Sequence, residues 1–109
     1  MALTMTRTRT QKALTKLAER VAAVHGELAY VEGRLDAGDV ELREELREGL
    51  ARRHGELMAM REALYVTLRQ FDSALDPTAI GSSDEWLKPF GRGTAGRRRY
   101  EAALPLRTA

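Results

Sequence analysis

The sequence has no cysteine, only three prolines and few aromatic residues, which account for 6% of its 109 residues. The absence of cysteine excludes disulfides, thiolate nucleophiles and cysteine-based zinc sites. No apolar run approaches the ~20 residues of a membrane span. The first ten residues alternate threonine with arginine and lack the apolar core of a secretory signal. We therefore expect a cytoplasmic protein without membrane contact.

Charge is plentiful but unevenly distributed. Charged residues make up 31% of the chain, a composition that favours extended, solvent-facing helices. The length of 109 residues leaves room for one domain. Residues 1–20 hold five bases and one acid, residues 21–80 seven bases and twelve acids, and residues 81–109 six bases and three acids. If the chain folds back on itself, both basic ends are expected together at one tip, far from an acidic bend.

Apolar residues spaced alternately by three and four predict two helices that pack along a heptad seam. The first seam comprises Leu14, Leu17, Val21, Val24, Leu28, Val31 and Leu35. The second comprises Leu46, Leu50, Arg53, Leu57, Met60, Leu64, Thr67 and Phe71. Gly38 and Asp39 suit a turn over residues 36–39. The fold class is therefore all-α: an antiparallel coiled-coil hairpin over residues 10–71, after a frayed basic N-terminus of residues 1–9.

One register would satisfy both seams, with the first helix starting near Thr10 and the second running from Val40 to Phe71. It pairs Leu28 with Leu46, Val24 with Leu50, Val21 with Arg53, Leu17 with Leu57, Leu14 with Met60, and Thr10 with Leu64. Arg20 and Glu56 would form a surface ion pair. In this register Arg53 either fixes the register or oligomeric state, or extends its charged end to solvent.

A second apolar strip flanks the seam. It comprises Ala18, Ala22 and Ala29 on the first helix and Ala51, Met58, Tyr65 and Leu68 on the second. Either the C-terminal segment covers this strip, or two hairpins associate into a four-helix dimer. We favour the dimer, because two helices alone bury little surface.

The segment 72–109 is predicted to hold short helices. Asp76 followed by Pro77 indicates a capped turn that ends near Ile80. Ser82 with Glu85 three residues later suggests a capping box that opens a second turn, stopped by Pro89. A last helix is expected from Ala95 to Leu104.

No nucleophile elbow, P-loop or Rossmann motif occurs, so we expect no enzyme, no cofactor and no metal. His25-Gly26-Glu27-Leu28 recurs as His54-Gly55-Glu56-Leu57, by duplication of a helix or by coincidence. Both histidines are expected on the flanks of the seam without a carboxylate partner. Both glycines are expected on the outer face of their helices, where they are either merely tolerated or allow a neighbouring segment to approach closely.

The stretch from Gly91 to Tyr100 is the main candidate for binding, because arginines contact phosphates and aromatic rings stack on bases. The candidate residues are Trp86, Lys88, Phe90, Arg92, Arg97, Arg98, Arg99 and Tyr100. We consider three roles: contact with nucleic acid or a nucleoprotein complex, docking of the arginines on acidic hairpin residues, and an adaptor or inhibitor that binds an acidic protein through aromatic and arginine anchors. The first is the leading hypothesis.

Residues 68–80 read LRQFDSALDPTAI, with a Phe-Asp step and an Asp-Pro step after the second helix. This segment resembles uncharacterised proteobacterial mobile-element proteins in which a coiled-coil hairpin precedes a short basic helix. In longer relatives that helix leads into a winged-helix DNA-binding region, which has no counterpart within these 109 residues. The resemblance therefore implies no independent sequence-specific DNA binding.

Overall fold

The computed structural model describes residues 2–37 and 42–104, with side chains from Arg9 onward. Two long helices, α1 (Ala2–Asp36) and α2 (Glu44–Phe71), precede the short 3-10 helices η1 (Pro77–Ala79) and η2 (Glu85–Phe90) and the helix α3 (Gly93–Ala103). No strand occurs among these described residues. The all-α hairpin with short C-terminal helices is confirmed, whereas its dimerisation stays a prediction.

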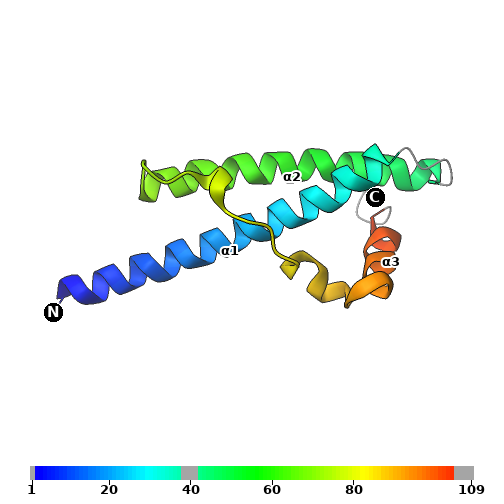
Figure 1. Cartoon of the computed structure of the whole chain (residues 1–109). Coiled ribbons are helices and arrows are strands. Elements are labelled where there is room, and N and C mark those ends of the chain that lie inside the picture. The colour runs from blue at the N-terminus through cyan, green and yellow to red at the C-terminus, as the bar shows by residue number, and fades with distance from the viewer. Residues whose placement is uncertain (1, 38–41, 105–109) are drawn as a thin grey trace.

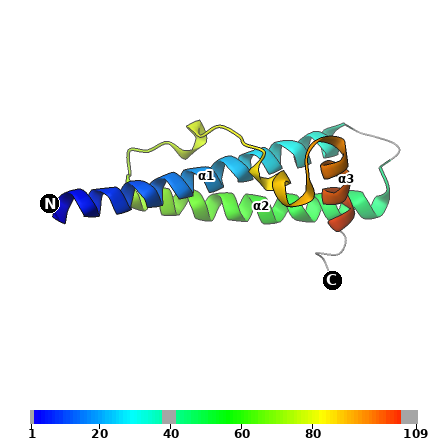
Figure 2. The ribbon, with the colours of Figure 1, turned by 90° about the horizontal axis from the view of Figure 1, so that it is seen from below.

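The hairpin is long and narrow, and the whole molecule measures 59 × 26 × 25 Å. The N-terminal end of α1 projects beyond the C-terminal end of α2 in both views (Figures 1 and 2). α1 begins at Ala2, so the expected start of the first helix near Thr10 is wrong, whereas the fraying of residues 1–9 stays a prediction. Threonine costs only about 0.7 kcal/mol or less in a helix, and neither glycine nor proline interrupts the chain before Gly26.

The second helix ends at Phe71 as predicted and begins at Glu44. Its expected first residue, Val40, and the expected turn residues Gly38 and Asp39 lie outside the described part of the chain. Glu44 and Glu45 occupy the first turn of α2, where the positive end of the helix dipole favours acids.

Two apolar clusters form the core. The larger contains Val24, Leu28, Val31, Leu42, Leu50, Leu57, Leu87, Tyr100 and Leu104. The smaller contains Val21, Tyr65 and Leu68, with Leu14, Leu17, Leu75 and Ile80 packed against it. The C-terminal segment thus contributes to both clusters, and the hairpin does not make the core alone.

The two helices meet in a different register from the expected one. Arg53 faces Glu27, to which its Nε donates a hydrogen bond of 2.6 Å, and not Val21, six residues earlier. Six residues correspond to about 9 Å along the helix. The expected ion pair between Arg20 and Glu56 is also wrong, because Glu56 accepts a 2.9 Å hydrogen bond from Arg53. A heptad pattern of similar aliphatic side chains fits several registers, and the buried carboxylate of Glu27 favours this one.

The pairing of Leu17 with Leu57 is wrong as well, because these leucines belong to different clusters. Met60 is 37% exposed, although it was expected in the interface opposite Leu14. Phe71 is 48% exposed and Thr10 is exposed too, whereas the other expected interface residues on both helices are buried or half-buried. The sequence pattern therefore identified most residues of the helix interface, but not the residues that they contact across it.

The C-terminal segment wraps around α1. After Phe71 the chain runs back along the hairpin, crosses α1 and places η2 and α3 against the half of the hairpin near the bend (Figures 1 and 2). At the crossing, the backbone N–H of Ser83 donates to the carbonyl of Ala22 at 2.9 Å. The segment covers part of the flanking apolar strip, which was one of the two expected solutions, while Ala51 and Met58 remain exposed.

The caps of the short helices were partly predicted. Asp76 caps η1 as expected, since its Oδ1 accepts hydrogen bonds from the backbone N–H and the hydroxyl of Thr78. These bonds, the hydroxyl first, lower the pKa of Asp76. The capping box of Ser82 is not formed, because η2 begins after Asp84. Pro89 lies inside η2 and does not stop it, because a 3-10 turn tolerates proline better than an α-helix.

The glycines of the repeated His-Gly-Glu-Leu motif differ in their surroundings. A Cβ on Gly26 would come within 2.0 Å of the carbonyl oxygen of Ser83 and 3.1 Å of Trp86 Nε1, so this glycine permits the crossing. A Cβ on Gly55 would meet nothing within 4 Å. The two copies of the motif therefore have different structural roles.

The wrapping also separates the two basic ends. The N-terminus of α1 lies at one end of the rod and α3 lies near the bend at the other (Figure 1). The expectation that both basic ends meet at one tip is wrong, because the chain after α2 returns along the hairpin. Within the described residues, no helix combines the length and the apolar character that crossing a bilayer requires.

Candidate nucleic-acid interface

The helix α3 is fixed to the hairpin by its inner face. Tyr100 is 1% exposed and Leu104 2%, and both belong to the larger core cluster. Gly96 is also buried, and a Cβ there would come within 2.1 Å of the carbonyl oxygen of Gly91. Gly91 has a φ of +104°, a conformation that side-chain-bearing residues rarely adopt. These two glycines allow the sharp reversal between η2 and α3.

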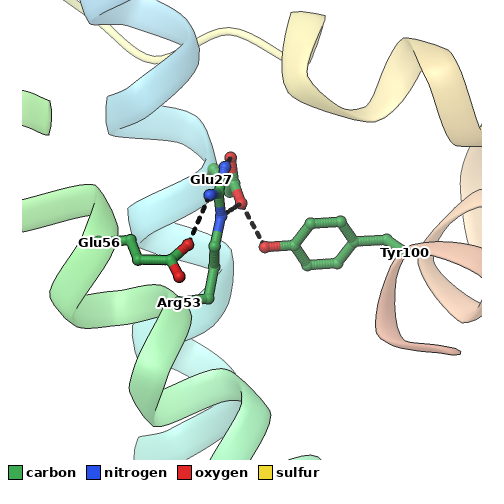
Figure 3. Close-up of polar contacts among 4 residues, drawn as sticks. All are labelled: Glu27, Arg53, Glu56 and Tyr100. Atoms are coloured by element: carbon green, nitrogen blue, oxygen red, sulfur yellow. Dashed lines mark hydrogen bonds and ion pairs between the residues drawn. The ribbon is translucent and has the colours of Figure 1, made fainter. Parts of the chain in front are cut away.

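A buried carboxylate joins all three α-helices (Figure 3). Glu27 on α1 is 5% exposed and accepts hydrogen bonds from Arg53 Nε at 2.6 Å and Arg53 Nη2 at 3.1 Å. It also accepts a hydrogen bond from the hydroxyl of Tyr100 on α3. The bond to Glu27 raises the pKa of Arg53, and burial followed by the same carboxylate raises that of Tyr100. A charged arginine and a neutral tyrosine therefore satisfy Glu27.

A second network of one carboxylate, one arginine and one tyrosine lies nearby and joins α3 to α1. Glu101 of α3 accepts from Arg34 Nε at 2.7 Å, from Arg34 Nη2 at 3.3 Å and from the hydroxyl of Tyr30. Burial and the bond to Glu101 raise the pKa of Tyr30. The two networks fix the orientation of α3 on α1, because each carboxylate has its donors in fixed positions.

The predicted stacking residues lie inside the fold. Trp86, Phe90 and Tyr30 surround Tyr100, with ring centroids 4.9, 5.4 and 5.9 Å from its ring. Trp86 and Phe90 are half-buried and Tyr100 is buried. These rings stabilise the docking of α3, and none of the three offers a free face for stacking on a base.

The predicted cationic residues, in contrast, lie on the surface. Arg92, Arg97 and Arg98 are exposed, and none of their side chains forms a hydrogen bond or ion pair with another described residue. Arg99 is exposed too, but its Nη1 donates a 2.9 Å hydrogen bond to the carbonyl of Phe90. Lys88 Nζ lies 3.0 Å from a carboxylate oxygen of Glu85. We call Arg92, Arg97 and Arg98 the α3 arginines.

Two of these arginines border a hollow of about 370 Å³. Its lining residues are Asp84, Glu85, Leu87, Lys88, Gly91, Arg92, Gly93 and Arg97. Acidic and basic side chains share this lining, beside the exposed arginines on the outer side of α3.

The histidines have partners that the sequence did not reveal. His25 Nδ1 donates to the carbonyl of Ile80 at 2.8 Å, and His25 Nε2 accepts from the hydroxyl of Tyr65 at 2.6 Å. His54 Nε2 lies 3.0 Å from a carboxylate oxygen of Glu32. The expectation that neither histidine has a carboxylate partner is therefore wrong for His54. Among the described residues, no group of three potential ligands could hold a metal ion.

Sequence reasoning missed Glu27, Tyr30, Arg34 and Glu101, which hold the site in place. The signal for Glu27 was Arg53 within an otherwise apolar seam, because a cation there requires a buried anion. No local signal indicated Glu101, whose partners lie 67 and 71 residues away along the chain. Comparison with models of known families, with curated proteins and with solved structures found no match to this chain.

Proposed function

We propose that this protein is a non-enzymatic, self-associating coiled-coil interaction module of the cytoplasm whose basic C-terminal segment contacts nucleic acid or a nucleoprotein complex. The observation that supports this proposal best is the exposure of the α3 arginines on a helix whose opposite face is anchored in the core. A rigid platform keeps arginines in place for contact with phosphate oxygens, so less conformational entropy is lost on binding.

The position of these arginines also favours an anionic partner. Arg97 and Arg98 follow the first turn of α3, whose positive dipole end disfavours cations. Neither side chain stabilises the fold through a hydrogen bond to another described residue. A phosphate group at this helix end would interact favourably with the dipole and with both guanidinium groups.

The alternative function, a protein-binding adaptor, requires aromatic side chains that are free to bind a partner. Trp86, Leu87 and Phe90 pack in or against the larger core cluster and are not free to enter a pocket of a partner. A partner protein whose acidic surface binds only the arginines would still be compatible with the structure. Binding to nucleic acid therefore has the better support, and the acidic protein becomes an outcome of the test.

Fluorescence anisotropy with a labelled DNA duplex at 50 and 200 mM salt tests the proposal. Three phosphate contacts give a slope of log K against log salt of about −2.7, or about 40-fold weaker binding across this range. The variant Arg97→Ala/Arg98→Ala is expected to bind much more weakly at 50 mM salt. The matched control is Arg52→Ala/Arg69→Ala, which removes two exposed arginines of α2. Absence of wild-type binding at low salt would refute the proposal.

Self-association is supported by large apolar side chains of α2 that remain exposed. Met58 and Met60 are each 37% exposed, and Val66 and Phe71 are each 48% exposed, all on α2. Light scattering of the purified chain is expected to give the mass of a dimer, and Met60→Ser/Phe71→Ser to shift it toward the monomer. A wild-type monomer at tens of micromolar would refute this part of the proposal.

A further inference from the structure

A row of four basic side chains runs along the N-terminal half of α1. Arg9, Lys12, Lys16 and Arg20 are exposed, and only Glu19 among the residues from 9 to 20 carries a negative charge. Their spacings of three, four and four residues place them on one face of the helix. We call this row the basic stripe. None of the four side chains forms a hydrogen bond or ion pair with another described residue, so all four are available for a ligand.

The basic stripe lies on the same side of the molecule as α3. Continuing the face of Arg20 by one and two heptads leads to Glu27 and Arg34, which bind Tyr100 and Glu101 of α3. The residues of α1 that contact α3 therefore continue the line of the basic stripe toward the bend. In Figure 2, η2 and then α3 follow in the direction of the bend, with α3 running across the hairpin.

Two neighbouring hollows connect the stripe with α3. The first has a volume of about 670 Å³ and is lined by Lys16, Glu19, Arg20, Ala22, Ala23, Ser83 and Glu85. The second is the hollow of about 370 Å³ beside Arg92 and Arg97. Glu85 lines both, and its charge is offset by Lys88 at 3.0 Å. The wrapping segment therefore brings the two basic parts of the sequence to adjacent depressions on one side.

Building on the function proposed above, we infer that the basic stripe is a second phosphate-binding surface and that the rod lies along double-stranded DNA with both surfaces engaged. About 38 Å of helix separate Arg9, the first residue of the basic stripe, from Arg34, where α3 docks through Glu101. One turn of B-form DNA measures about 34–36 Å, so one side of the rod reaches phosphates along a full turn. Contact is expected with the phosphate backbone, because the exposed groups of both surfaces are cations, while Trp86 and Phe90 pack around Tyr100.

The salt dependence of binding tests this inference. Seven phosphate contacts predict a slope of log K against log salt of about −6 on a 20-base-pair duplex, against about −2.7 for the α3 arginines alone. The variant Lys16→Gln/Arg20→Gln loses two contacts, so its slope is expected to fall to about −4.5. Glutamine is a good helix former, and the circular dichroism spectrum of each variant checks that α1 is intact. Arg52→Gln/Arg69→Gln is the matched control and is expected to keep the wild-type slope.

Duplex length gives a second measurement. An 8-base-pair duplex is about 27 Å long, too short to reach both surfaces, and is expected to lower the wild-type slope to about −3. Unchanged slopes for Lys16→Gln/Arg20→Gln and for the short duplex would overturn the second surface. If Arg97→Gln/Arg98→Gln then still weakened binding, the proposed function would stand without this inference. Tighter wild-type binding to single-stranded DNA or to an RNA duplex of equal length would overturn the assignment to double-stranded DNA.

Discussion

Two single substitutions in the repeated motif, Gly26→Ala and Gly55→Ala, are expected to change the stability of the protein in opposite directions. Gly55 lies on the exposed face of α2 with open space around it. Alanine there adds helix propensity and is expected to stabilise the protein by about 0.5–1 kcal/mol. For a domain of this size, the midpoint of thermal unfolding should rise by about 2–6 °C.

Gly26→Ala gains the same propensity but introduces a methyl group 2.0 Å from the carbonyl oxygen of Ser83. That neighbour is backbone, and it is held by the 2.9 Å hydrogen bond from its own N–H to Ala22. The crossing segment must move, and overpacking of this kind costs about 1–3 kcal/mol. Thermal and urea unfolding followed by circular dichroism measure both variants, with Trp86 fluorescence as a local probe. A stabilisation of Gly26→Ala equal to that of Gly55→Ala would refute the crossing of α1 by the C-terminal segment.

Three further predictions concern the buried carboxylates. Tyr100→Phe removes a hydrogen bond to a charged acceptor and should lower the free energy of unfolding by about 1.5–3 kcal/mol in urea titrations, and a loss below measurement error would contradict the contact. Glu27→Ala removes the buried anion shared by Arg53 and Tyr100 and leaves Arg53 with Glu56 alone, so a larger loss of about 3–5 kcal/mol is expected. The double variant Glu27→Ala/Arg53→Met should recover part of this loss. The pKa of Tyr30 and of Tyr100 is raised in the folded state. Above about pH 10 tyrosine loses its proton in the unfolded chain first, so stability should fall with rising pH there. Tyr100→Phe should make this fall shallower in unfolding curves between pH 9 and 11.5, and equal slopes would argue against the network.

The local features of the fold followed from the sequence. The end of α2 at Phe71 and the cap of η1 by Asp76 agree with expectation because helix ends depend on neighbouring residues. The seam residues were found for a similar reason: a spacing of three and four places them on one helix face whatever they pack against. Exposure of the α3 arginines was also expected.

The start of α1 was misjudged because threonine was given too much weight as a helix breaker. The register was misjudged for a different reason. Aliphatic residues repeat along both helices, so shifting one helix past the other leaves the pattern of contacts nearly equivalent. The ion pair of Glu27 with Arg53 distinguishes these registers, and it joins residues 26 positions apart.

The sequence by itself determined that the chain forms two long amphipathic helices and a basic C-terminal segment, because periodicity, caps and charge are local properties. Only the tertiary structure decided where that segment goes. Its path over Gly26 depends on the close approach of backbones far apart in the chain. That path turns Trp86, Phe90 and Tyr100 inward and leaves the arginines outward. It also places the basic stripe of α1 and the arginines of α3 on one side, because burying the aromatic rings requires α3 to dock there.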